Sequence, residues 1–137
     1  MAHKTWAQKY ETRKEPEIET ADKDFADVKK GDKMLIATPR IFDEYIREIP
    51  KGHAVDLPRM RKDIAAQFNC DVMCPITSGI FLRIVAEKAH EEYTQGATIK
   101  KITPFWRAIG VKSSTAKKLT FGTAFIADMR NSEKIDA

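Results

Sequence analysis

The chain has 137 residues, enough for one domain with a single hydrophobic core. Its composition, 42% hydrophobic and 32% charged, is typical of a folded globular protein and excludes the disordered and membrane classes. No apolar run approaches the ~18 residues of a spanning helix, and residues 1–14 lack the apolar stretch of a signal peptide. We therefore expect a cytoplasmic protein without a membrane partner.

The net charge of +4 is unevenly distributed along the chain. Residues 1–50 carry ten Lys and Arg against eleven Asp and Glu, whereas residues 51–137 carry fourteen against nine. The basic excess therefore lies in the C-terminal part, as expected of a protein that contacts a polyanion. A modest excess of this kind is also found in proteins that bind no nucleic acid.

Cysteines and histidines give little sign of a reactive or metal site. Cys70 and Cys74 are expected to be free thiols, because a cytoplasmic chain with only one possible cysteine pair rarely forms a disulfide. The histidines do not follow at zinc-ligand spacing and stand beside neither cysteine: His3, His53 and His90. We expect no metal and no cofactor, and the sequence offers no nucleophile paired with a base.

Residues 1–38 are predicted to form an N-terminal arm that packs on the rest of the chain. Trp6 and Tyr10 lie one helical turn apart and indicate a short helix. Residues 22–30 indicate a second short helix, and residues 34–36 a short strand.

A helix is predicted from Pro39 to Ile49, with Thr38 as its N-cap. Its apolar positions recur at helical spacing: Ile41, Phe42, Tyr45, Ile46 and Ile49. Its polar face is expected to carry Asp43, Glu44, Arg47 and Glu48.

Two further helices, at 56–68 and 75–93, are separated by a turn at 69–71 and fit the helix-turn-helix pattern. The apolar positions expected in the second are Ile80, Phe81, Ile84, Val85 and Ala89. Residues 99–109 alternate as in a strand, a Lys- and Ser-rich loop follows at 112–118, and a last helix contains Phe125, Ile126 and Met129. The fold class predicted is mainly α with a small β component.

In a helix-turn-helix, the first turn of the second helix enters the major groove of DNA. Here that turn contains Thr77, Ser78 and Gly79, and Arg83 follows one turn later. Glycine inside a helix costs about 1 kcal/mol relative to alanine, so Gly79 indicates close approach by another molecule. The alternative is that Gly79 packs against the preceding helix.

The first of these helices would cross the phosphate backbone with Arg59, Arg61 and Lys62. Arg107 and Lys112 would extend this basic surface, although each cation could instead belong to a solvated face. Phe105 and Trp106 are neighbours on the predicted strand, so one is expected in the core and the other in a pocket beside Pro104. A pocket aromatic could stack on an extruded base; otherwise both rings lie in the core.

Four segments in this order, IPKGHAV, LPRMRKDIAAQF, CPITSGIFLRIVAEKAHEEY and ITPFWRAI, resemble the C-terminal domain of the alkylguanine-DNA alkyltransferases. The resemblance covers residues 49–110 and implies a winged helix-turn-helix domain, here at 39–137. Pro104 and Arg107 match the ends of the family's Pro-Cys-His-Arg motif.

The chain departs from the family where alkyl transfer takes place. Phe105 and Trp106 replace the acceptor cysteine and the histidine that activates it, so no thiolate acceptor can form there. The arginine that the family inserts into the duplex would fall near Ile76 or Thr77, and its early tyrosine near Leu57 or Pro58; both are missing. The glycine pair of the following loop is also absent from KSSTAKKLTFG.

The resemblance therefore implies the non-transferring branch of the family, and we expect a non-enzymatic protein that binds double-stranded DNA, with DNA repair or damage recognition as its role. A protein-interaction module whose winged helix no longer binds DNA is the alternative. The third and last hypothesis is an unrelated enzyme that uses Cys70 or Cys74.

Overall fold

The computed structural model describes residues 4–136, in which the fold is mainly α-helical with a small sheet, as predicted. Residues 1–3 of the expected arm, including His3, and residue 137 lie outside the described residues. The elements are α1 (Trp6–Thr12), β1 (Glu17–Thr20), β2 (Lys33–Ile36), α2 (Pro39–Arg47), α3 (Leu57–Gln67), β3 (Val72–Met73), α4 (Pro75–Thr94), the 3-10 helix η1 (Phe105–Arg107), α5 (Ser114–Lys118) and α6 (Ala124–Ser132). None of the helices in residues 4–136 is both long and apolar enough to cross a membrane.

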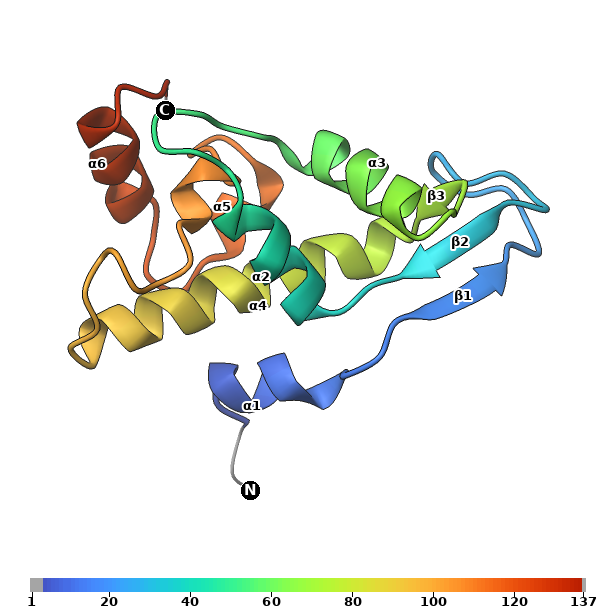
Figure 1. Ribbon diagram of the computed structural model, residues 1–137, viewed down its shortest axis with the longest axis horizontal. Helices are drawn as coiled ribbons and strands as arrows, with labels where there is room; N and C mark the ends of the chain where they lie inside the picture. Colours follow the sequence, from blue (N-terminus) through green and yellow to red (C-terminus); the bar gives the residue numbers. More distant parts are fainter. Residues whose placement is uncertain (1–3, 137) are drawn as a thin grey trace.

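Helix α4 is the element against which most others pack. It extends across the molecule behind α2, and it contacts α1, α2, α3, α5 and η1 (Figure 1). Its buried side chains point in several directions, because partners surround it: Ser78, Phe81, Leu82, Ile84, Val85, Ala86, Glu87 and Ala89. The predicted apolar positions are confirmed as buried except Ile80, which is 53% exposed.

The sheet lies at one end of the molecule, away from α6 (Figure 1). β2 is its central strand, antiparallel to β1 and parallel to β3, with Leu35 opposite both Ile18 and Met73. Only β2 was expected from the sequence. Every residue of β1 is exposed and β3 has two residues, so neither shows the alternating pattern that identifies a strand.

The helix predicted at 22–30 is wrong. These residues form turns in which Phe25 and Val28 make a β-bridge and Ala26 has a φ of 49°. The loop is closed across its base, because Ala21 and Asp32 are joined by a backbone hydrogen bond that continues the β1–β2 pairing. The backbone N–H and C=O groups that would pair within a helix instead form hydrogen bonds across this hairpin.

The strand predicted at 99–109 is also wrong, because this segment contains turns and η1. Phe105 and Trp106 are therefore both buried instead of pointing to opposite faces. The Phe105 ring stacks on Phe125 from α6 and meets Phe121 edge-on. This segment is therefore stabilised by aromatic packing against α6 and not by backbone hydrogen bonds to a neighbouring strand.

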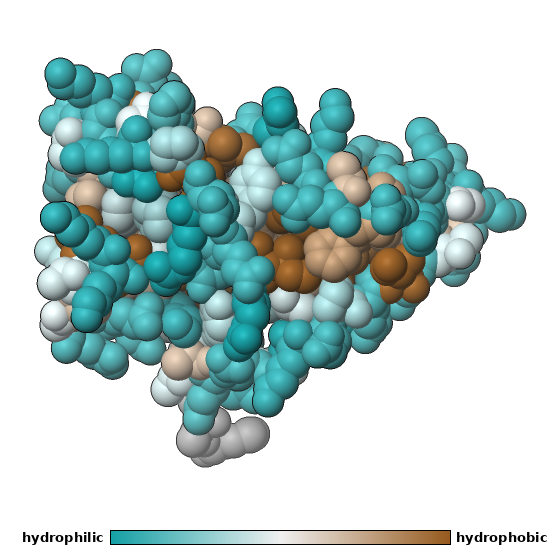
Figure 2. All heavy atoms as spheres, in the orientation of Figure 1, coloured by the Kyte–Doolittle hydropathy of each residue, from teal (hydrophilic) through white to brown (hydrophobic). Residues whose placement is uncertain are grey.

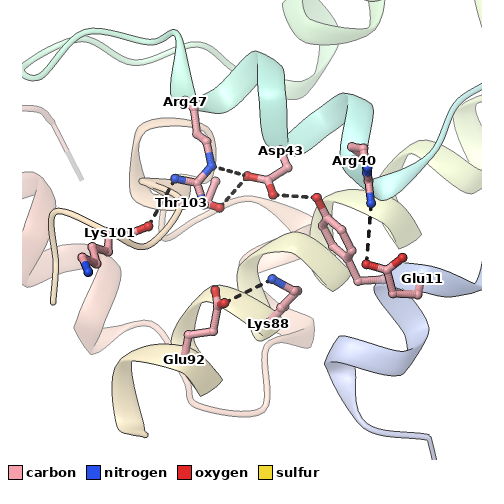
Figure 3. A network of polar contacts seen from close by, with 9 residues as sticks. Glu11, Arg40, Asp43, Arg47, Lys88, Glu92, Lys101 and Thr103 are labelled. Atoms are coloured by element: carbon pink, nitrogen blue, oxygen red, sulfur yellow. Dashed lines mark hydrogen bonds and ion pairs between the residues drawn. The ribbon is translucent and has the colours of Figure 1, made fainter. Parts of the chain in front are cut away.

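Asp43 was expected on the polar face of α2 but is buried. Figure 3 shows its carboxylate between Arg47 and Thr103. Its carboxylate accepts hydrogen bonds from Tyr10 Oη (2.7 Å), Thr103 Oγ1 (2.6 Å) and Arg47 Nε (2.9 Å). Burial of Tyr10, together with its hydrogen bond to Asp43, raises the pKa of the phenol well above its usual value. Asp43 therefore joins α1 to α2 and to the segment that precedes η1.

We predict that Tyr10→Phe lowers the free energy of unfolding by about 1–2 kcal/mol, because the buried Asp43 carboxylate loses a hydrogen-bond donor. Urea denaturation followed by circular dichroism measures this. The control is Tyr93→Phe, since Tyr93 is 40% exposed and a hydroxyl at the surface can bond to water instead. Equal stability of the two variants would contradict the anchoring role of Tyr10.

Candidate nucleic-acid interface

Helices α3 and α4 are the two helices of the predicted helix-turn-helix, and their connection is partly ordered by the sheet. Asn69, with a φ of 57°, ends the first helix, and β3 then pairs with β2 before α4 begins at Pro75. Cys74, the N-cap of α4, makes no side-chain capping bond, and the first turn has no acidic residue. The start of this long helix therefore keeps free N–H groups and a positive dipole end.

The exposed face at the start of α4 is a ridge made of Ile76, Gly79 and Ile80, which we call the α4 ridge. Ile76 is 66% exposed and Ile80 is 53% exposed. Apart from its chain neighbours and the nearby backbone of α4, no atom would lie within 4 Å of a Cβ atom built on Gly79. The hypothesis that Gly79 packs against the preceding helix is therefore wrong, and the ridge is free for another molecule to approach.

Thr77 and Ser78, expected to face a groove, do not belong to this ridge. Ser78 is fully buried, and its hydroxyl donates to the Cys74 carbonyl oxygen at 2.5 Å. The Thr77 hydroxyl is buried without a partner. A glutamate at position 78 would bury a charge and disrupt folding, so it could not test binding at this face.

Each of the eight arginines is engaged within the fold. Seven form ion pairs: Arg13, Arg40, Arg47, Arg59, Arg61, Arg83 and Arg107. The eighth, Arg130, is buried and donates to backbone carbonyl oxygens of Trp106, Ile109 and Asp136. The arginines are therefore used to hold segments of the chain together.

Three of the arginines predicted to contact DNA have specific structural partners. Arg61 donates twice to Asp27, at 2.8 and 2.9 Å, and is only 14% exposed in its side chain. Arg83 lies over the Trp6 ring and 3.5 Å from Glu87. Arg107 pairs with Glu133. The structure does not bring these three side chains together at one surface.

The other predicted phosphate contacts are more accessible. Arg59 pairs with Asp63, but its side chain is 69% exposed. Lys62 and Lys112 are exposed and make no ion pair among the described residues. The same holds for further lysines of the C-terminal part: Lys51, Lys100, Lys101, Lys117, Lys118 and Lys134.

Two hollows lie near the segment expected to form a pocket. Pro104 and Trp106 line the smaller one, of about 420 Å³, whereas Phe105 lies in the core. A larger hollow of about 590 Å³, which we call the α3–α5 hollow, lies between the start of α3, Leu82 of α4 and the 110–115 loop. Its remaining lining residues are Ala54, Val55, Asp56, Leu57, Pro58, Ala108, Gly110, Ser113, Ser114, Thr115 and Arg130.

Glu133, which the sequence did not indicate, holds this region together. Its side chain is 3% exposed and accepts hydrogen bonds from Trp106 Nε1 (2.8 Å), Arg107 Nε (2.9 Å) and the Gly52 amide (3.1 Å). Burial alone would raise the pKa of this carboxyl, but the bonds from Arg107, Gly52 and Trp106 outweigh it and lower the pKa. Glu133 follows α6 in a run of polar residues, and no sequence pattern there predicts that its side chain is buried.

The thiols show no sign of reactivity. Cys70 and Cys74 are free, and Cys74 is buried. Burial raises the pKa of the Cys70 thiol, which is the opposite of what a reactive cysteine needs. Across residues 4–136, no three His, Cys, Asp or Glu side chains are grouped so that they could hold a metal ion.

No protein-family model, curated protein or solved structure matches the chain. Its function is therefore inferred from geometry and from the residues themselves.

We predict that Glu133→Gln lowers the free energy of unfolding by about 3–5 kcal/mol, because Arg107 keeps its charge and loses its carboxylate partner. The folded pKa of Glu133 lies below its unfolded value, so its contribution is present above about pH 4.5 and is lost as pH falls through the folded pKa. Urea denaturation across pH should show the largest difference from wild type above about pH 5. A difference that does not shrink in acid would contradict this.

Proposed function

We propose that the chain is a non-enzymatic DNA-binding protein of the alkyltransferase-like type that receives duplex DNA against the α4 ridge. The observation that carries this proposal is Gly79, a helix-destabilising residue whose exposed face meets no other part of the protein. A glycine there allows a backbone or a base edge to approach closely, and no packing requirement explains it.

The surroundings of the ridge favour an anionic partner. The uncapped start of α4 offers N–H groups and a positive dipole end to a phosphate. On α3, the exposed Lys62 and Arg59 supply positive charge, as the helix that crosses the backbone would. Exposed isoleucines on the ridge suit apolar contact with thymine methyl groups.

The mode of binding that follows is largely independent of sequence. Bidentate recognition of guanine requires an arginine or lysine at a base edge, and all eight arginines here are engaged within the fold. The exposed unpaired cations are lysines, which hold phosphate as point charges. We therefore expect steeply salt-dependent binding with little sequence preference.

A role in DNA repair requires a place for a displaced base, and the α3–α5 hollow is our candidate. Leu57, Pro58 and Leu82 give it apolar walls, and the Ser113–Thr115 hydroxyls stand on its other side. Apolar walls with a few polar groups are the usual surroundings of an extruded base. Tighter binding of a duplex with one alkylated guanine than of a plain duplex would support damage recognition.

Gly79→Ala is the sharpest test of the ridge. Because a Cβ there meets open space, we expect the variant to be about 0.5–1 kcal/mol more stable than wild type and yet to bind DNA more weakly. Urea denaturation measures the first effect and fluorescence anisotropy with a labelled duplex, over a salt series, the second.

The matched control is Asn131→Ala, which also replaces a helical residue by alanine, at an exposed position on α6. It should leave the affinity for DNA unchanged. If Gly79→Ala bound the duplex as tightly as Asn131→Ala, the ridge would not be the DNA-binding face.

The second candidate function is a protein-interaction module, favoured by the exposure of two isoleucines one turn apart on α4. Exposed apolar side chains at this spacing match the anchors by which helices meet other proteins. This candidate predicts that the ridge binds protein and that duplex DNA does not bind even at low salt.

Ile76→Lys separates the two functions, because the side chain is 66% exposed and folding should tolerate the change. For a DNA-binding ridge, we expect tighter duplex binding and a salt slope steeper by about one unit, since one cation is added near phosphate. For a protein-binding ridge, no duplex binding should appear in either protein. Weaker duplex binding by the variant would contradict a phosphate-facing position.

A further inference from the structure

The face between α2 and α3 carries an open groove with an apolar floor, which we call the α2–α3 groove. Its volume is about 590 Å³, and its floor is formed by Ile41, Tyr45, Ile49, Val55 and Phe68. Figure 2 shows hydrophobic side chains gathering on this face between the two helices. Along α2 and the turn that follows it, the groove extends from Ile41 to Ile49, roughly 12 Å at about 1.5 Å per residue, which is enough for two turns of a second helix.

The walls of this groove are held in place by polar contacts beneath it. Tyr45 Oη donates to Asp63 at 2.5 Å, and this bond, after burial, raises the pKa of Tyr45 to about 12. Arg107 Nη1 donates to the Ile49 carbonyl oxygen at 3.0 Å, and the Val55 amide donates to the Arg107 carbonyl oxygen at 2.9 Å. A groove fixed in this way loses little conformational freedom when it binds a ligand.

The rim of the groove is acidic, against the positive charge of the whole chain. Glu44 on α2 and Glu48, the C-cap of this helix, are exposed, stand one turn apart and form no ion pair within residues 4–136. None of the residues that line the groove is Lys or Arg. Like charges at this spacing are unfavourable in an isolated helix.

This combination identifies the chemistry of the occupant. The two carboxylates repel nucleic acid and anionic lipid, and they attract Lys and Arg. An apolar floor along two helical turns fits side chains spaced at i, i+3 or i+4 on an amphipathic helix. We propose that the α2–α3 groove binds a basic amphipathic helical segment of a partner protein, whose apolar side chains lie on Tyr45 and Phe68 and whose cations meet Glu44 and Glu48.

The proposal does not depend on DNA binding and is tested without DNA. The probe is a labelled synthetic peptide of about 14 residues, roughly four turns of helix, with leucines at helical spacing and lysines elsewhere. Anisotropy with the full chain should give saturable binding in about the micromolar range. Amide chemical-shift changes should concentrate in residues 41–55 and 67–68.

The double variant Glu44→Lys/Glu48→Lys should bind the peptide about tenfold more weakly. Its matched control is Glu19→Lys/Asp22→Lys, with the same change in charge at exposed acids outside the groove, which should bind as wild type does. A peptide with glutamates in place of the lysines should not bind.

Three results of the peptide experiments would overturn the proposal, and a fourth comes from the protein alone. They are equal weakening in both double variants, shift changes centred outside the groove, and no binding up to about 1 mM. Sedimentation of the protein alone is the last arm of the test. A dimer whose groove amides shift with protein concentration would mean that a second copy of this chain, not a basic segment, occupies the groove.

Discussion

The buried carboxylate of Glu133 is the interaction on which the C-terminal half of this fold depends. A charge removed from water must be paired and hydrogen-bonded, and here the partners come from η1 and from the loop after α2. Gly52 can donate its amide because its φ of 85° is accessible to glycine. These bonds fix Trp106 and Arg107 in η1. Arg107 also donates to the Ile49 carbonyl oxygen and accepts from the Val55 amide, so it fixes both ends of the loop that borders the α2–α3 groove.

Two other buried carboxylates also connect segments that are far apart in the sequence. Asp43 joins α1, α2 and Thr103, and Glu87 on α4 accepts from both the amide and the hydroxyl of Thr120. Arginines are the partners in several of these joints, and this use has a functional consequence. The arginines of this chain are held in ion pairs or hydrogen bonds within the fold, whereas the exposed cations without an ion pair among residues 4–136 are lysines, which bind phosphate as point charges.

The α4 ridge and the α2–α3 groove differ in charge and therefore in the partners that they favour. The α4 ridge lies at the positive end of a long helix whose first turn has no acidic residue. The α2–α3 groove carries two glutamates above an apolar floor, and neither forms an ion pair in the part of the chain that the structure describes. A polyanion at the first surface and a basic helix at the second could be bound by one molecule, which would place a nucleic acid and a protein on the same small scaffold.

The sequence by itself determined the longer helices α2, α3 and α4, because their signals are local; it did not determine α5, which lies in the segment predicted as a loop, and it predicted a helix at 22–30 that is absent. Thr38 and Asp56 cap α2 and α3 as expected, and the apolar spacing that predicted α2, α3 and α4 reflects the period of a helix. It also singled out Gly79, although it left open whether another molecule approaches this residue or whether it packs against the preceding helix. Only the tertiary structure decided that Asp43 and Glu133 are buried, that Ile80 is exposed and that residues 105–107 form a turn. These features depend on contacts between residues far apart in the chain, such as Trp106 with Glu133, and such contacts leave no periodic pattern that could be read in sequence order.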